Sequence, residues 1–470
     1  MKWWQGGLLV GCLAMLILLC GGGLMGGVWY YRTAEITQTA DEATLIAPTP
    51  DEAAGADGLL PSEERPPSVP PNSRGEEGRS EALSENARNR ILVLGTDGNV
   101  FTVSPEGEAR VQLTDNASRA RKYRYPTWSP DGRMIAFVEV LTNEDSLDSA
   151  LHVVSPDGQL KQEVPTQFPP FYLFWNPTGE KLTFLSNWTN GMALRMVDVA
   201  GGATEATTLQ EGMPFFFSWE PTGNTMLAHI GGDLLTFLDL SGELAPLDIA
   251  TGPFQAPHWS ADGQKLAFVS EGEKRENLLS VSNPQGEEVM EVTRQRGLFS
   301  FNWSPDNQRI AYSYSQQTIG LGAFGPLWVH DTTTNQAWEL SNEPVVAFFW
   351  SPDGQRLAFL RPELHEPVKR VPEAAPLRQN SQLWLRWHIW NGERTYPLTI
   401  FQPTDSFLAD YLRYFDQYAQ STSLWSPDSQ MLLYAGLSER GLSGIWALPV
   451  KEGSSAHRVA GGELATWSPH

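Results

Sequence analysis

The residues best suited to chemistry in this sequence are scattered rather than grouped. Eight histidines occur, and none is spaced as H-x-H or H-E-x-x-H, patterns that direct two imidazoles to one metal ion. The string nearest to a G-x-S-x-G nucleophile elbow is GLSGI at 441–445, which lacks the last glycine. Cys12 and Cys20 lie in one apolar stretch, so neither a disulfide framework nor a zinc–thiolate site is expected. We assign no catalytic residue, no metal and no cofactor.

Aromatic and basic side chains gather instead in five irregular segments. These are 115–127, 165–174, 211–218, 251–258 and 293–301. In a chain of formal net charge −22, cations beside aromatics indicate a candidate binding surface. The ordinary alternative, in which the aromatics wedge between sheets and the cations balance nearby carboxylates, stays open. With two aromatics of a later segment, the candidate ligand-binding residues are Arg121, Lys122, Tyr123, Arg124, Tyr172, Phe216, Phe254, His258, Arg294, Arg296, Tyr411 and Phe415.

Between these segments one phrase recurs, and it spells a β-hairpin. FFWSPDGQRLAFL at 348–360 has close relatives beginning at Thr127, Phe174, Ser218, His258, Asn302 and Leu424. In S-P-D-G the proline presets φ for a type I turn, and the glycine accepts the left-handed conformation that follows. Asn307 replaces this glycine well, because asparagine tolerates positive φ, whereas Ser429 fits less well. The apolar runs after each turn are typical of buried strands.

A second hairpin signal follows each copy, so every repeat contains four expected strands. Four strands at a period of about 40–45 residues indicate a β-propeller blade. The chain ends in an eighth copy, TWSPH at 466–470, which supplies only an innermost strand, while 90–114 supplies three strands. Joined, they complete one blade and remove the free sheet edges. The expected fold is all-β, a single eight-bladed propeller over 90–470, closed by pairing of the C-terminal strand with the N-terminal blade.

The repeats resemble the TolB-type, WD-like propeller family, whose hallmark is W-S-P-D-G followed by an apolar strand. The resemblance covers 90–470 and concerns fold rather than activity. TolB has six blades and an extra N-terminal domain, so a role in the Tol–Pal system does not follow. The prolyl-oligopeptidase family carries similar propellers before a hydrolase domain, but this chain ends with its repeats and has no nucleophile elbow.

The N-terminal segment reads as a membrane anchor. Residues 6–31 carry no charge and exceed the roughly 20 residues that span a bilayer, with aromatic side chains at both ends. A cleaved signal peptide and a lipoprotein box at 9–12 are the alternatives. Residues 1–5 are expected in the cytoplasm, and the proline-rich, acidic linker 32–89 is expected to be disordered. These features predict a single-pass membrane protein with its propeller on the extracytoplasmic side.

The acidic charge argues against nucleic acid and against an anionic membrane surface as partners, leaving the N-terminal helix as the membrane contact. We expect a binding module in which the five irregular segments lie on one face of the propeller, the loop face, and meet a protein, peptide or glycan. The alternatives are a propeller enzyme, such as a lyase or glycosidase with its site at the channel mouth, and a structural subunit of an envelope complex.

The repeat is interrupted once, between Trp350 and Trp425. The excess residues lie in two loops, 361–382 and 400–423. The second loop contains aromatics at i, i+4 and i+8, which predicts a helix over about 405–419, with Thr404 or Asp405 as its cap. This helix would cross near the channel mouth, either as a lid or docking surface or as a seal for a wide channel.

Overall fold

The computed structural model describes residues 88–143, 146–189, 191–212, 214–315, 325–363, 383–438 and 443–470. The expected tip, anchor and nearly all of the linker lie outside the described residues. Within these ranges, no helix is both long enough and apolar enough to cross a bilayer. All described strands belong to one compact unit, Arg74–His470.

Six sheets have four strands each, and every strand pairs antiparallel with its neighbours. Two of these sheets are β3 (Val111–Gln112), β2 (Val100–Val103), β1 (Ile91–Leu94) and β31 (Leu464–Trp467), then β4 (Arg121–Trp128), β5 (Ile135–Thr142), β6 (Leu147–Val154) and β7 (Lys161–Thr166). The next two are β8 (Pro170–Trp175), β9 (Lys181–Trp188), β10 (Gly191–Asp198) and β11 (Thr207–Glu211), then β12 (Phe215–Trp219), β13 (Thr225–Ile230), β14 (Leu234–Asp239) and β15 (Leu244–Pro246). The last two are β16 (His258–Trp259), β17 (Leu266–Glu271), β18 (Asn277–Ser282) and β19 (Met290–Gln295), then β20 (Leu298–Trp303), β21 (Arg309–Ser315), β22 (Gly325–Asp331) and β23 (Gln336–Val345).

The seventh sheet spans two repeats. Its strands are β24 (Ala347–Trp350), β25 (Leu357–Glu363), β26 (Trp384–Trp390), β27 (Thr395–Pro403), β28 (Met431–Leu437), β29 (Ser443–Pro449) and β30 (His457–Ala460). Gln402 and Pro403 at the end of β27 pair with Leu437 and Gly436 of β28, which joins the two repeats. Before β28, Trp425 makes only an isolated bridge to Leu432 instead of a full strand. The described chain therefore has seven hydrogen-bonded sheets rather than eight separate blades.

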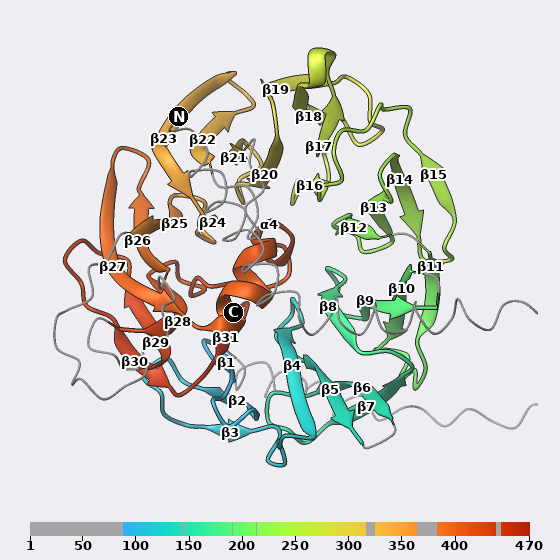
Figure 1. The fold of residues 1–470 in the computed structure, drawn as a ribbon, viewed down its shortest axis with the longest axis vertical. Helices are drawn as coiled ribbons and strands as arrows, with labels where there is room; N and C mark the ends of the chain where they lie inside the picture. The colour runs from blue at the N-terminus through green and yellow to red at the C-terminus, as the bar shows by residue number, and fades with distance from the viewer. Residues whose placement is uncertain are drawn as a thin grey trace, which may run out of the picture. The chain divides into compact units, whose positions relative to one another are not determined.

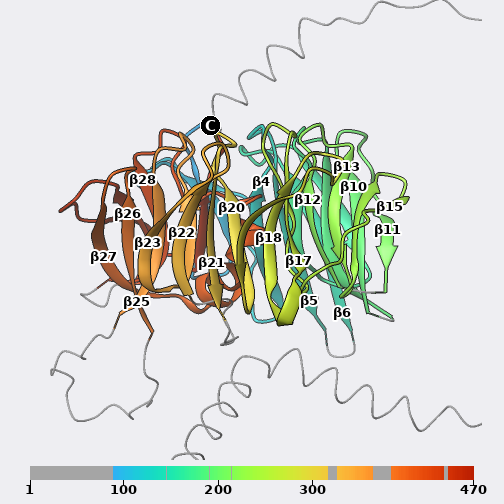
Figure 2. The ribbon, with the colours of Figure 1, turned by 90° about the horizontal axis from the view of Figure 1, so that it is seen from above.

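The sheets stand around a common centre, as in a β-propeller (Figure 1). The predicted closure is confirmed, because β31 pairs antiparallel with β1 from Ile91–Trp467 to Leu94–Leu464. Figure 2 shows the ring from its side, with the C-terminal end of the chain on one face. We call the end that carries the S-P-D-G-like turns the turn face, and the opposite end the loop face.

The turns have the predicted hairpin geometry. In the copy at 351–354 the Gly354 N–H donates to the Ser351 carbonyl (2.8 Å), and Gly354 has a φ of 67°. The Ser351 hydroxyl donates to the Asp353 carboxylate (2.5 Å) and accepts from the Arg356 N–H (2.9 Å). Each turn is therefore tied to the first residues of the strand that follows it.

Successive turns are also tied to one another. A cation at one repeat position donates to the backbone carbonyl of the left-handed residue in the next turn. The three pairs are Lys265 to Asn307 (3.1 Å), Arg309 to Gly354 (2.8 Å) and Arg356 to Ser429 (2.6 Å). These cations hold neighbouring repeats together on the turn face.

Candidate binding site

The centre of the ring is occupied by the segment that follows β27, which we call the plug (residues 405–421). Its helical turns are η2 (Phe407–Tyr411, a π-helix), η3 (Leu412–Tyr414, a 3₁₀-helix) and α4 (Phe415–Tyr418). The chain is helical over 405–418, close to the predicted bounds, but it is not one regular α-helix. The Thr404 hydroxyl accepts the Phe407 N–H (3.2 Å), so Thr404 caps the start as predicted.

The aromatic side chains of the plug pack against the inner strands. Phe415 meets Phe348 edge-on, with ring centroids 4.8 Å apart, and Tyr411 stacks on Phe349 at 6.0 Å. Both Tyr411 and Phe415 are buried, and burial raises the pKa of the Tyr411 phenol. These two candidate ligand-binding residues therefore belong to the core, which supports the interpretation of the segment as a seal.

Gln417 fastens the plug to the opposite side of the ring. Its Nε2 donates to the Tyr172 hydroxyl (2.8 Å) and to the Phe217 carbonyl (2.8 Å), while the Tyr418 hydroxyl donates to the Phe171 carbonyl (3.1 Å). Tyr172 is buried, and burial raises the pKa of its phenol. Sequence reasoning missed Gln417, although a polar residue inside an aromatic segment was a usable signal.

Four candidate residues lie together at the start of β4 on the loop face. Arg121, Lys122, Tyr123 and Arg124 line a recess of about 230 Å³. Arg121 is paired with Glu139, and the buried Tyr123 donates to the Asn116 side chain (2.7 Å). Lys122 and Arg124 are exposed, and the charge of Arg124 acts on the carboxyl of Asp410 in the same recess.

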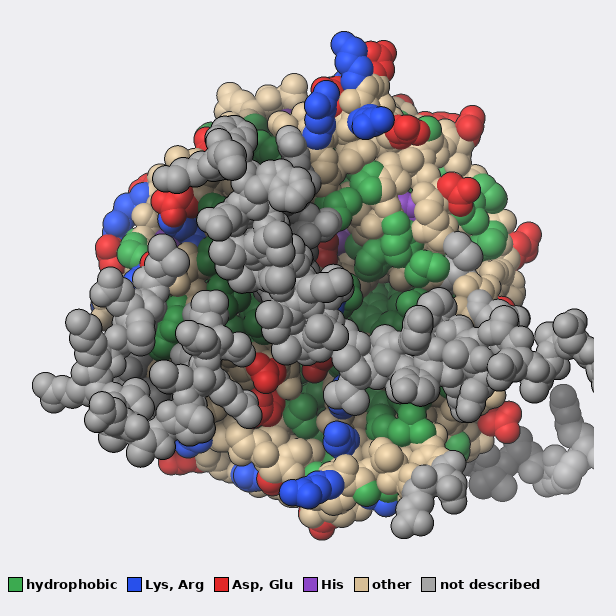
Figure 3. Space-filling view, viewed as in Figure 1, with side chains coloured by type: hydrophobic (Ala, Val, Ile, Leu, Met, Phe, Trp, Pro, Cys, Tyr) green, Lys and Arg blue, Asp and Glu red, His purple; other side chains and the backbone are tan. Residues whose placement is uncertain are grey.

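The remaining loop-face candidates lie elsewhere. Phe216 and Phe254 are partly exposed and pack together at 4.5 Å, while Arg294 is bound to Glu291 (2.8 Å). Arg296 is exposed just beyond β19. Figure 3 shows hydrophobic side chains around the hollow near the centre of this view and separate groups of Lys and Arg towards its edges. The structure does not bring the predicted residues into one site.

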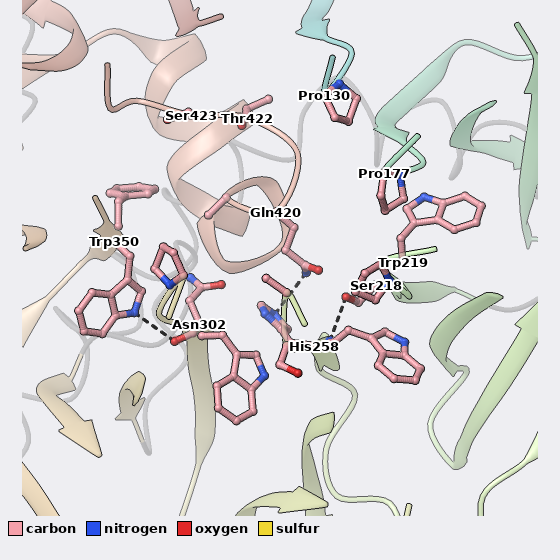
Figure 4. A pocket seen from close by; sticks show the side chains of 18 of the residues that line it. Pro130, Pro177, Ser218, Trp219, His258, Asn302, Trp350, Gln420, Thr422 and Ser423 are labelled. Carbon is pink, nitrogen blue, oxygen red and sulfur yellow. Dashed lines mark hydrogen bonds between the residues drawn. The ribbon is translucent and has the colours of Figure 1, made fainter. Parts of the chain in front are cut away.

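On the turn face, the central channel opens as a funnel of about 480 Å³ (Figure 4). Its wall repeats the hairpin phrase, with indoles and prolines contributed by successive repeats. The indoles are Trp175, Trp219, Trp259, Trp303, Trp350 and Trp425, and the prolines are Pro130, Pro177, Pro221 and Pro305. Ala419 and Gln420 of the plug, with Thr422 and Ser423 beyond it, also line this space. We call it the turn-face funnel.

His258 faces this funnel, although the sequence suggested a place for it on the loop face. The Nε2 atom of His258 lies 3.3 Å from Nε2 of Gln420, as Figure 4 shows. Burial lowers the pKa of His258 to about 3, so its imidazole is neutral at physiological pH. Because His258 begins β16 next to Trp259, its position follows from the strand that it opens.

The funnel presents no charged side chain. None of the residues that line it is Asp, Glu, Lys or Arg, and its polar groups are amides, hydroxyls and the neutral imidazole. Such a lining can hold apolar groups and hydrogen-bond to uncharged ones, and it penalises a buried charge. In the described part of the chain, no group of three His, Cys, Asp or Glu side chains is placed to hold a metal ion.

Comparison with known proteins gives only remote similarities. No family model matches the chain. It is similar to an uncharacterized protein of Agrobacterium fabrum, with 22% identity over 248 residues, which are 49% of this chain and 83% of that protein.

Two solved structures illustrate the range of similar folds. One is an oligogalacturonate lyase in complex with manganese, 13% identical, covering 73% of this chain and 86% of that chain at a TM-score of 0.44. The other is TolB from Acinetobacter baumannii, 14% identical, covering 72% and 83% at a TM-score of 0.33. A TolB protein among the similar structures agrees with TolB-like repeats. Similarity this remote carries no activity to the present chain.

Proposed function

We propose that this protein is a binding module that receives an uncharged segment of a protein or peptide partner in the turn-face funnel. The observation that carries the proposal is the lining of indoles, prolines and neutral polar groups in a chain of formal net charge −22. Aromatic walls with a few hydrogen-bonding groups are typical of sites that recognise apolar or proline-containing segments. A neutral glycan would meet the same lining and is the alternative ligand.

The plug gives the funnel a floor. Gln420 is held beside His258, and Ser423 donates through its hydroxyl to the Trp425 carbonyl (2.9 Å). Because these groups are fixed before any ligand arrives, binding would require little further ordering of the site. A preformed floor of this kind supports a binding role.

Position 261 offers a direct test of the funnel. Ala261 replaces proline in one turn, lines the funnel and is exposed, whereas Ala337 is an exposed alanine on β23. A photo-reactive amino acid at position 261 should cross-link a protein partner in intact cells, and the same group at 337 should not. Equal labelling from both positions, or none from 261, would contradict the proposal.

We also propose that residues 6–31 anchor the chain in the cell membrane, with 32–89 as a linker and the propeller outside the cytoplasm. The long uncharged segment with aromatic ends supports this arrangement. Protease added to spheroplasts should then release a soluble fragment that begins within 32–89. Full protection of the chain, alongside intact cytoplasmic markers, would contradict it.

The ring itself is best described as eight repeats. In this proposal β24–β27 and β28–β30 are two blades that share hydrogen bonds at Gln402–Pro403, and the plug stands where the innermost strand of the second would begin. The repeated tryptophans support it, since Trp350 and Trp425 both donate an indole N–H to a carbonyl of the preceding repeat (3.3 and 3.1 Å).

A second candidate function, an enzyme of the lyase or glycosidase class, is favoured by the loop-face recess. Asp410 and Glu463 both line it, and burial raises the pKa of each carboxyl. Tyr125 in the same recess has a φ of 54°, and strained residues cluster at active sites. Turnover of a glycan that is lost in both Asp410→Asn and Glu463→Gln, and retained in Gln420→Ala at the funnel, would establish this function instead.

A further inference from the structure

The loop-face recess brings together four segments that are far apart in the chain. It lies between the connection of β1 to β2 (94–98), the start of β4, the start of the plug and the residues that open β31 (Figure 1). Its volume of about 230 Å³ is smaller than the roughly 300–1,000 Å³ of the clefts that hold drug-sized ligands. A ligand of this recess is therefore a small molecule or a single small group.

Six charged side chains line the recess, three of each sign. They are Asp97, Asp410, Glu463, Arg121, Lys122 and Arg124. Asp97 is used within the protein, because it accepts the Asn99 N–H (3.0 Å) and pairs with Arg110 (3.9 Å). Arg121 is likewise paired with Glu139. Within the described residues the other four form no ion pair, so the recess holds unpaired charges of both signs.

The two unpaired carboxyl groups, those of Asp410 and Glu463, are partly buried on a fixed backbone. Asp410 belongs to the π-helical turn η2. The Glu463 N–H donates to the Leu94 carbonyl (2.8 Å), and the Glu463 carbonyl accepts from the Thr404 hydroxyl (2.6 Å). Burial raises the pKa of both carboxyl groups, although the charge of Arg124 lowers that of Asp410. Both groups therefore lack a close cation.

The two unpaired cations, Lys122 and Arg124, are exposed and lie two residues apart on β4. Residues two apart on a strand point to the same side of the sheet, so both cations can reach one ligand. A β-bulge follows them, because the register of β4 on β5 shifts between Arg124 and Thr127, and Tyr125 has a φ of 54°. Bulges commonly redirect side chains beside functional sites. The strand is thus distorted where its cations meet the recess.

The neighbouring charged groups do not neutralise these four. The negative charge of Asp405 raises the pKa of Glu463 further. Arg413, the cation of the plug, lies over the ring of Tyr414 (5.3 Å) and is not among the residues that line the recess. The unpaired charges are therefore available to a ligand.

We propose that the loop-face recess binds a small amino acid as a zwitterion, with its ammonium group at the two carboxyl groups and its carboxylate at the two cations. A ligand with one positive charge would be repelled by Lys122 and Arg124, and an anion would meet two partly buried carboxyl groups. A zwitterion pairs with both sets at once through charge-assisted hydrogen bonds. This site is separate from the turn-face funnel and does not depend on the binding proposed there.

The test compares zwitterions with singly charged molecules by calorimetric titration of the full chain. The zwitterions are glycine, β-alanine and 4-aminobutyrate, in which the two charges are progressively further apart, and the singly charged probes are n-butylammonium and butyrate. The tightest zwitterion should bind at least about tenfold more tightly than either singly charged probe, because it alone satisfies both sets of charges. Absence of binding by all three zwitterions, or equally tight binding of a singly charged probe, would overturn the proposal.

Matched variants assign the binding to the recess. Asp410→Asn and Arg124→Gln should each weaken binding of the tightest zwitterion about tenfold. Asp115→Asn and Arg119→Gln alter exposed side chains of the same charge outside the lining and should leave it unchanged. Arg124→Gln should also bind n-butylammonium more tightly than the unaltered protein does, since a repelling charge is gone.

Arg124→Gln decides the outcome if Asp410→Asn fails to fold, because Arg124 is exposed. Unchanged zwitterion binding in Arg124→Gln, or equal losses in the two control variants, would overturn the proposal. The same variant separates this site from the enzyme considered above, which would use the carboxyl groups of the recess without requiring its cations.

Discussion

Ser429 shows how a single residue of the repeat is adapted to its neighbours. It stands where other copies have glycine, and it adopts a φ of 60°. Its hydroxyl accepts the Asp353 N–H of the preceding turn (3.1 Å), and its carbonyl accepts from Arg356 (2.6 Å). Asn307 does the same with its side-chain oxygen and the Asp262 N–H (3.3 Å). A non-glycine residue is strained in the left-handed backbone conformation, and here hydrogen bonds between repeats offset that strain.

This account predicts different consequences for two small substitutions. Ser429→Ala should lower the free energy of unfolding by about 1 kcal/mol, because it leaves the Asp353 N–H without its acceptor. Ser429→Gly loses the same bond, but it also removes the Cβ that makes the left-handed backbone conformation unfavourable by about 1 kcal/mol. The free energy of unfolding of the glycine variant should therefore stay close to that of the unaltered protein. Denaturant unfolding of the two variants measures the difference. A glycine variant as unstable as the alanine variant would contradict it.

Asp416 gives the protein a pH dependence of known sign. Its pKa is about 6 in the folded state against an ordinary 3.8, so the folded state holds this proton more tightly than the unfolded state. The stabilisation is complete below about pH 4 and is lost as the pH rises through about 6. Asp416→Asn should remove this contribution, so the free energy of unfolding of the variant minus that of the unaltered protein should rise between pH 4 and pH 7. If the midpoints of thermal unfolding of the variant and of the unaltered protein change in parallel with pH across that range, Asp416 is not the cause.

At the scale of the element, the plug is held by a few side chains rather than by its own helical bonds. Its π, 3₁₀ and α turns are each too short to be stable alone, since isolated helices need about 12–15 residues. Aromatic packing on one side and Gln417 on the other fix its place. The plug is thus a tertiary structure in which the local conformation follows the contacts.

Gln417→Ala should therefore destabilise the protein more than the loss of a few side-chain atoms suggests. The change removes the side-chain donor to the buried Phe217 carbonyl, and an unsatisfied buried group costs about 1–3 kcal/mol. The Tyr172 hydroxyl loses one hydrogen bond and keeps its bond to the Gln417 carbonyl (3.3 Å). Gln420→Ala, which removes a partly buried amide at the funnel, is the matched control and should cost less than about 1 kcal/mol. Equal losses for both variants in denaturant unfolding would mean that Gln417 is not the fastening point.

For the whole molecule, closure of the ring rests on the pairing of β31 with β1. The Ser468 N–H donates to the Arg90 carbonyl (2.7 Å) and the Glu463 N–H to the Leu94 carbonyl (2.8 Å), just beyond each end of the pair. On its other side, β31 is tied to the second residue beyond the plug, since the Trp467 N–H donates to the Ser423 carbonyl (2.9 Å). One short strand thus joins the first repeat to the segment that follows the plug in the last repeat.

Removal of residues 460–470 should open the ring and expose the edge of β1 together with the buried surface beneath Trp467. We expect loss of the cooperative thermal transition and aggregation of the truncated chain. A synthetic peptide of sequence 460–470 added during refolding should restore the transition, and a scrambled peptide should not. A truncated chain that melts like the full chain would refute the closure.

The sequence by itself determined the features that depend on neighbouring residues. The hairpin turn at 351–354, the four-strand repeat and the missing strand that β31 supplies all follow from turn chemistry and hydrophobic pattern. Only the tertiary structure decided which side chains meet across repeats. It placed His258 in the funnel, turned Tyr172, Tyr411 and Phe415 into core residues, merged two repeats into one sheet and raised the pKa of Asp416 through burial. These outcomes depend on groups far apart in the chain, and burial and pKa are properties of the packed surroundings rather than of the residue.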